Sequence, residues 1–112
     1  MLQDAHSRKI SEAVEAAVGD TTIVAAAEGE WHYIHELIGD LASAGSLTVI
    51  AKSGATEEIL GYFELGDGQG LTLQDEPGED NRPRFEFKPG YDAVLRVTGG
   101  EFNGSVHWSI RN

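Results

Sequence analysis

The sequence predicts an all-β fold, arranged as an antiparallel β-sandwich, and two patterns lead to this prediction. Glycine occurs at 14 of 112 positions, and glycine-containing turns cut the chain into segments of about five to ten residues, as in sandwiches and barrels. Several of these segments also alternate apolar and polar side chains, which is typical of strands with one buried face. The length fits one domain that buries roughly 60–70% of the surface its unfolded chain exposes.

The most regular alternation lies at the end of the chain, over residues 104–111. We expect one face of this strand to be buried and to carry Val106, Trp108 and Ile110. The opposite face then carries His107 and Ser109. Four further segments are predicted as strands from alternation or from their branched and aromatic residues: Leu47–Lys52, Ile59–Leu65, Phe85–Phe87 and Val94–Val97.

The first forty residues leave two interpretations open. Ser11–Val18 ends at a glycine and fits a capped helix. Residues 34, 37, 38 and 41 are apolar at the spacing of an amphipathic helix face. However, Trp31 and Tyr33 are weak helix formers, and Gly39 would interrupt the second helix. Local patterns therefore do not decide between helix and strand in this part.

Composition and charge exclude several classes of protein. There are 19 acidic and 8 basic side chains, a net charge of -11, and the isoelectric point is near 4.5. Nucleic acid and anionic membranes repel such a charge, so neither is expected as a partner. The absence of cysteine excludes disulfides and thiolate chemistry. No apolar run is long enough to cross a bilayer, no signal-peptide core is recognised, and we expect a soluble domain.

Two groups of residues invite a metal-site interpretation that we do not favour. His32, His35 and Glu36 would share one face of a helix, but on a strand His35 points away from the other two. The run Gly66–Gly70 is followed by acidic residues at 75, 76, 79 and 80, which offer oxygen ligands for calcium. A glycine turn beside a solvated acidic loop is the favoured interpretation. We therefore predict no metal and no cofactor.

Enzymatic chemistry is also not expected. No serine lies in a Gly-x-Ser-x-Gly turn, and His107 is predicted to face outward on its strand. Five aromatic residues offer a platform for stacking a sugar ring: Trp31, Tyr33, Tyr62, Tyr91 and Trp108. The favoured interpretation places Trp108 in the core and Trp31 or Tyr33 at a subunit interface.

Five segments follow the order found in small proteins encoded among the structural genes of tailed bacteriophages: residues 19–27, 42–45, 47–54, 66–70 and 104–108. The chain resembles this family over about residues 19–111. Two segments depart from its pattern, Glu30–Tyr33 and the acidic stretch Asp75–Pro83. The resemblance implies a jelly-roll-like sandwich of about eight strands, in which Thr21–Ala27 and Trp31–Leu41 are strands.

The resemblance also implies a function. It indicates a non-enzymatic virion protein on the capsid exterior, made in the host cytoplasm, that decorates or cements the capsid by contacting the major capsid protein. It implies self-association, and we favour a homotrimer. The alternative is a receptor- or glycan-binding module at the tip of a phage fibre or spike.

The domain division follows from the same comparison. Residues 1–18 are expected to form an N-terminal arm and lead-in, and residues 19–112 the sandwich. Residues 1–10 carry His6, Arg8 and Lys9 close together, so the arm is expected to contact a neighbouring subunit or the capsid. The candidate contact residues are Arg8, Lys9, Ile10, Trp31 and Tyr33.

Overall fold

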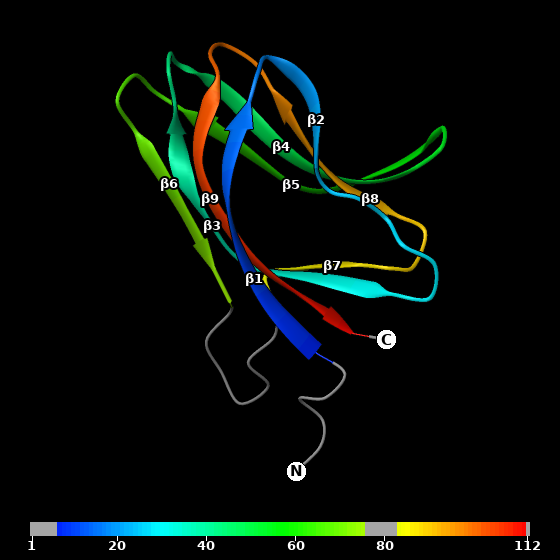
Figure 1. Cartoon of the computed structure of the whole chain (residues 1–112). Helices are drawn as coiled ribbons and strands as arrows, with labels where there is room; N and C mark the ends of the chain where they lie inside the picture. The colour runs from blue at the N-terminus through cyan, green and yellow to red at the C-terminus, as the bar shows by residue number, and fades with distance from the viewer. Residues whose placement is uncertain (1–6, 76–82, 112) are drawn as a thin grey trace.

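The computed structural model describes residues 7–75 and 83–111, which form nine strands in two antiparallel sheets. Sheet A contains, in spatial order, β1 (Ser7–Ala16), β9 (Phe102–Arg111), β3 (Trp31–Leu41) and β6 (Gly70–Gln74), with β7 (Phe85–Phe87) also beside β3. Sheet B contains, in spatial order, β2 (Gly19–Val24), β8 (Asp92–Val97), β4 (Gly45–Ser53) and β5 (Thr56–Leu65). The two sheets form the layers of a sandwich (Figure 1).

The strand order is that of a jelly roll. β6 pairs with residues 36–40 of β3, and β7 pairs with residues 32–34, so both occupy the same edge of sheet A. Counted as one interrupted strand, they complete an eight-stranded jelly roll with the sheet orders 1-9-3-6 and 2-8-4-5. The predicted fold class is confirmed. Within the described residues, the structure has no helix long and apolar enough to cross a membrane.

The core lies between the sheets and follows the alternation of the strands. β3 contributes Ile34, Leu37 and Leu41, and β4 contributes Leu47, Val49 and Ala51. β7 and β9 add the fully buried rings of Phe87 and Phe102. Alternate residues of the strands, with the order shifted by one position in β3 at the register shift between Ile34 and Glu36, therefore meet in one apolar layer that holds the sheets together.

The expected N-terminal arm over residues 1–18 is wrong for Ser7–Ala16, which form β1. This strand pairs with β9 without a register shift, from Ser7 opposite Arg111 to Ala16 opposite Phe102. Val14 and Ala16 are buried in the core, and this burial outweighs the helix preference of the alanine-rich segment. The helix interpretation of residues 11–18 is therefore also wrong. Residues 1–6 lie outside the described part of the chain.

The other uncertain segments are strands, as the resemblance implied. β3 has the expected bounds, Trp31–Leu41. The strand expected at Thr21–Ala27 ends earlier, because β2 stops at Val24 and Asp92 Oδ1 accepts a hydrogen bond of 2.7 Å from the Ala26 backbone N–H. β6 follows the expected glycine turn at residues 66–70 and had no counterpart among the predicted strands. The acidic loop residues 76–82 lie outside the described residues.

The predicted faces of the last strand need one correction. Val106 and Ile110 are buried and His107 is exposed, as expected. Trp108 is only half-buried, because it lies opposite Ile10 of the edge strand β1, and its indole N–H donates to Glu12 Oε1 at 3.0 Å. Ser109 is 4% exposed although it lies on the outer face. Strand alternation alone did not predict which outer-face residues become covered.

Candidate functional site

Two small clefts lie among the described residues. One lies between β1 and β2, is lined by Glu12 and Thr21 among others, and has a volume of about 160 Å³. The other, of about 30 Å³, is lined by Ala51, Glu58, Glu86, Lys88 and Tyr91. Sites for drug-sized ligands are usually about 300–1,000 Å³, so neither cleft fits one. The outer surfaces of the two sheets carry further polar and aromatic groups.

The outer face of sheet A, called here the sheet A face, carries a row of polar side chains across four strands. Ser11, His107, Glu36 and Gln74 lie opposite one another on β1, β9, β3 and β6. Ser11 Oγ lies 3.0 Å from His107 Nδ1, and His107 Nε2 lies 3.5 Å from Glu36 Oε1. Gln74 donates its amide N–H to Glu36 Oε2 at 3.0 Å. The row ties the four strands together through their side chains.

A β-bulge in β3 creates a second polar group on the same face. The register with β9 shifts between Ile34 and Glu36, so His35 is the extra residue. His35 Nε2 lies 2.7 Å from Ser109 Oγ, and His35 Nδ1 lies 3.0 Å from both carboxylate oxygens of Asp75. The predicted separation of His35 from Glu36 is wrong, because the bulge turns both to the outer face while His32 is buried in the core at 2% exposure.

The Ser109–His35–Asp75 arrangement has the connectivity of a catalytic triad, but its surroundings do not fit nucleophilic catalysis. Ser109 is 4% exposed, so its hydroxyl is closed to a substrate. It also lies in a central strand, between Lys9 of β1 and Tyr33 of β3. Sheet pairing on both sides uses the backbone N–H groups that an oxyanion hole would need. We assign the group a structural role, in which Ser109 and Asp75 provide hydrogen-bond partners for the two ring nitrogens of His35 at the bulge.

Metal binding finds no support in the described residues. Within residues 7–75 and 83–111, no group of three histidine or acidic side chains is placed to hold a metal ion. His35 and His107 each already contact a carboxylate and a serine. The calcium interpretation also involved residues 76, 79 and 80, which lie outside the described part of the chain.

At one end of the sheet A face, three side chains form what we call the aromatic patch: Trp31, Tyr33 and Arg111. The two rings stack, with centroids 6.4 Å apart and planes 12° apart. The guanidinium of Arg111 lies over Tyr33, 5.8 Å from the ring centroid. Trp31 remains 36% exposed. Tryptophan, tyrosine and arginine are the residue types enriched at the centres of protein interfaces.

The structure brings the predicted contact residues to the same end of sheet A. Trp31 and Tyr33 lie on β3, opposite Arg111 and Ser109 of β9. Arg8, Lys9 and Ile10 lie on β1, on the other side of β9, in register with Ile110, Ser109 and Trp108. Sequence analysis missed Arg111, although it alternates outward next to Ile110. The other predicted aromatics do not join the patch: Tyr91 and Trp108 pack against the core, and Tyr62 lies on sheet B.

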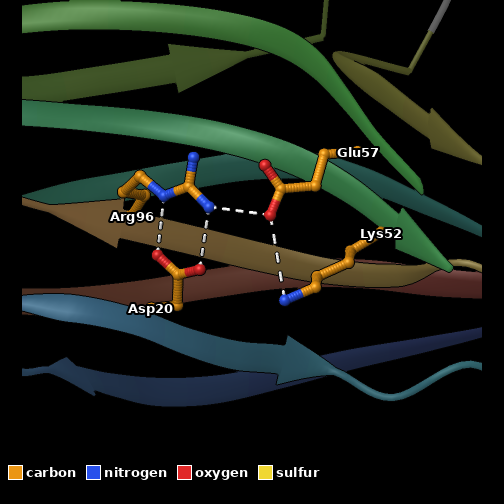
Figure 2. Close-up of polar contacts among 4 residues, drawn as sticks. All are labelled: Asp20, Lys52, Glu57 and Arg96. Atoms are coloured by element: carbon orange, nitrogen blue, oxygen red, sulfur yellow. Dashed lines mark hydrogen bonds and ion pairs between the residues drawn. The ribbon is translucent and has the colours of Figure 1, made fainter. Parts of the chain in front are cut away.

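The outer face of sheet B, called here the sheet B face, is organised by ion pairs. Arg96 of β8 donates two hydrogen bonds to the Asp20 carboxylate, at 2.8 and 2.9 Å, and a third to Glu57 Oε2 at 2.8 Å. Lys52 Nζ lies 3.8 Å from the same Glu57 oxygen. Figure 2 shows Arg96 between the two carboxylates and Lys52 beyond Glu57. The network joins β2, β8, β4 and β5.

The ion pair between Asp20 and Arg96 shifts the pKa of both residues. Hydrogen bonding to Arg96 holds the pKa of Asp20 below its usual value of 3.8. The hydrogen bonds from Arg96 to Asp20 and Glu57 raise the pKa of Arg96 further above its already high value. Both charges of the bidentate pair are therefore retained throughout the neutral pH range.

An apolar pair lies beneath this network. Ile50 and Val94 face each other on the outer side of sheet B and are 0% and 3% exposed. Ile50 and Val94 lie in one row across the strands, and Arg96 and Glu57 lie in the two neighbouring rows, one on each side. The ion pair between Arg96 and Glu57 therefore spans the row of the apolar pair. Ile59 continues the same row on β5 and is 64% exposed, and Tyr62 in the next row is 58% exposed.

Comparisons with known proteins identify the fold and no family. No protein-family model matches the chain, and no curated protein matches it. It is similar to a chain of the Bacillus endospore appendages, described as a novel family of disulfide-linked pili, with a TM-score of 0.58, 18% identity and coverage of 94% of this chain and 84% of that chain. This likeness shows a shared fold.

Two further solved structures are less similar. For the Drosophila NLP core, described in terms of pentamer formation and histone binding, the TM-score is 0.47, with 13% identity and coverage of 91% and 98%. For PirA, the TM-score is 0.37, with 12% identity and coverage of 95% and 92%. At these TM-scores, neither structure informs the function of this chain.

Proposed function

We propose that this chain is a non-enzymatic structural protein that decorates the capsid exterior of a tailed phage, in contact with the major capsid protein. The aromatic patch of Trp31, Tyr33 and Arg111 carries the proposal, because it offers exposed aromatic area and a positive charge on an otherwise acidic chain. Such residues bury large areas at little conformational cost.

The architecture supports an assembled, structural role. Jelly rolls are used in viral capsid and lectin domains, and the similar endospore-appendage chain is described as part of pili. That likeness points to a part of a larger structure. Disulfide linkage of the kind described for those pili is excluded for the present sequence, which has no cysteine.

Self-association is part of the proposal, and we favour a trimer that matches the local symmetry of a capsid. The long edge strand β1 of sheet A needs to be paired or covered to keep the sheet from aggregating. The molar mass in solution, measured by light scattering at several concentrations, tests this part. Self-association would be contradicted if the molar mass were that of a monomer at all concentrations, both for the purified protein and for the protein released from capsids.

The location is tested by labelling. Gold-conjugated antibody against this chain is applied to particles released from the strain that encodes it, followed by negative-stain microscopy. We expect gold over the capsid heads. Gold at the fibre or spike tip would instead favour the glycan- or receptor-binding alternative, and gold only on cellular filaments would contradict both phage functions.

The contact surface is tested with a pair of matched variants. Trp31→Ala with Tyr33→Ala removes the rings of the aromatic patch, whereas Tyr62→Ala removes an exposed ring on the opposite sheet. We expect the double variant to co-sediment with heads at least tenfold more weakly, and Tyr62→Ala to bind as the wild type. Equal binding of all three proteins would contradict a role for the patch.

A further inference from the structure

One free edge of sheet B is formed by β5. β5 is the last strand of sheet B and, within the part of the chain that the structure describes, pairs only with β4. One side of its ten-residue backbone therefore offers unpaired N–H and C=O groups, which is a template for an added strand.

Two exposed apolar side chains accompany this free backbone. Ile59 and Tyr62 account for two of the four large apolar residues that the described part of the chain leaves exposed. They lie next to each other on the sheet B face, beside the covered Ile50 and Thr48. An added strand would bury both side chains and would extend the apolar row that begins at Val94 and Ile50.

The charges on β5 are all negative. The strand contains Glu57, Glu58 and Glu64 and no basic residue. On the outer face, Glu57 and Glu64 flank the apolar pair on either side, in the order Glu57, Ile59, Tyr62, Glu64. A partner strand that matches this face has apolar residues in the middle and cations at both ends.

A second copy of the same strand does not match. If two β5 strands pair antiparallel about a two-fold axis between Leu60 and Gly61, then Ile59 lies opposite Tyr62, but Glu57 lies opposite Glu64 at both ends. Like charges directly opposite each other destabilise a sheet. The net charge of -11 adds a general repulsion between copies.

Two features of β5 restrict which strands can pair with it. Leu60 is the extra residue of a β-bulge, since Ile59 lies opposite Ile50 and Gly61 opposite Val49. Glu58 lies opposite the core residue Ala51 and lines the small cleft shared with Glu86 and Lys88. Bulges and inward-facing charges protect edge strands from unselected partners, so recognition here depends on charge and register together.

We infer that the β5 edge is a docking site for an extended, cationic segment of another protein, which adds to sheet B as a fifth strand. The segment places apolar side chains over Ile59 and Tyr62. It places one cation beside Glu64 and one beside Glu57, whose carboxylate also pairs with Arg96 and Lys52. This inference is independent of the aromatic patch, which lies on sheet A, so the failure of one does not affect the other.

The test uses a synthetic strand. Because the bulge makes the eight residues from Glu57 to Glu64 equivalent to seven positions, the probe is a fluorescent seven-residue peptide with the order lysine, threonine, valine, threonine, valine, threonine, lysine. Its binding is followed by anisotropy, and hydrogen exchange of the β5 amides is followed by NMR. We expect saturable binding that weakens with salt, together with slowed exchange of β5 amides.

Matched controls locate the interaction. Glutamate in place of both lysines in the peptide is expected to reduce affinity by at least tenfold. Glu64→Lys in the protein is expected to weaken binding about tenfold, whereas Glu15→Lys, an exposed residue on the other edge strand β1, is expected to leave it unchanged. Circular dichroism confirms that each variant is folded.

Three outcomes would overturn the inference. The first is equal binding of the lysine and glutamate peptides, and the second is slowed exchange at β1 with none at β5. The third is slowed exchange of β5 amides on raising the protein concentration without peptide, which would assign the edge to a second copy of this chain.

Discussion

The two outer faces of the sandwich are both polar, but they are stabilised in different ways. On the sheet A face, hydrogen bonds run through two histidines, and the serine partner of His35 is buried. On the sheet B face, permanent charges pair around Arg96 above a buried apolar pair. Strands of both sheets alternate apolar and polar residues in a similar way, yet their outer faces differ. The reason is that the residues facing each other on neighbouring strands decide whether a polar side chain is hydrogen-bonded to a neutral group or paired with a charge.

The largest effect is expected from the apolar pair of the sheet B face. Ile50→Ala should lower the free energy of unfolding by about 2–4 kcal/mol, since Ile50 is fully buried although it lies outside the main core. Urea denaturation followed by tryptophan fluorescence measures this. A loss below about 1 kcal/mol would show that the ion network does not create a second apolar layer.

An intermediate effect is expected on the sheet A face. His35→Ala should lower the free energy of unfolding by about 1–3 kcal/mol, because it leaves the buried Ser109 hydroxyl without its partner. The double variant with Ser109→Ala should recover part of this loss, since the unsatisfied hydroxyl is then removed as well. If the double variant were less stable than His35→Ala, the proposed burial penalty would be wrong.

A smaller, pH-dependent effect is expected at Asp20. Its pKa is lowered in the folded protein from the usual value of 3.8, so Asp20 stabilises the fold fully above that value and loses the contribution as the pH falls through the lowered pKa. Asp20→Asn should therefore reduce the melting temperature slightly at neutral pH. The difference from the wild type should close at strongly acidic pH.

The effect of Asp20→Asn should also depend on salt, because both side chains of the ion pair are more than one-third exposed, at 38% for Arg96 and 35% for Asp20. In 1 M salt the difference between the wild type and Asp20→Asn should shrink, whereas the loss caused by His35→Ala should persist. Equal salt sensitivity of both variants would contradict the distinction between the two faces.

The smallest effect is expected from metal removal. Since the histidines of the sheet A face are paired with carboxylates and serines, a chelator should leave the melting temperature unchanged. A fall that is restored by calcium or zinc, measured by differential scanning fluorimetry on the full chain, would contradict this expectation.

Several strands were predictable from the sequence for local reasons. Alternation of branched and polar residues placed β4, β8 and β9, because a strand with one buried face needs a period of two. The core residues Val106, Leu47 and Val49 follow from the same pattern. The resemblance was needed for β3, whose residues also fit the spacing of a helix.

The candidate surfaces were only partly predictable. Trp31 and Tyr33 are predicted from the sequence as contact residues, and Arg111 joins their patch only because β9 lies beside β3. The ion network joins Asp20 to Arg96, 76 positions apart in the sequence. No local pattern indicates such a pairing.

By itself, the sequence determined the period of β4, β8 and β9, the main turn positions, the net charge and the apolar residues available for a core, since these depend on neighbouring residues. The tertiary structure decided that Ser7–Ala16 is a strand, that a bulge turns His35 toward Ser109, and that the ion pair of Arg96 and Glu57 spans the row of Ile50 and Val94. These features arise from pairing between distant segments. Burial against a partner strand stabilises a local conformation more than the intrinsic preference of its residues does.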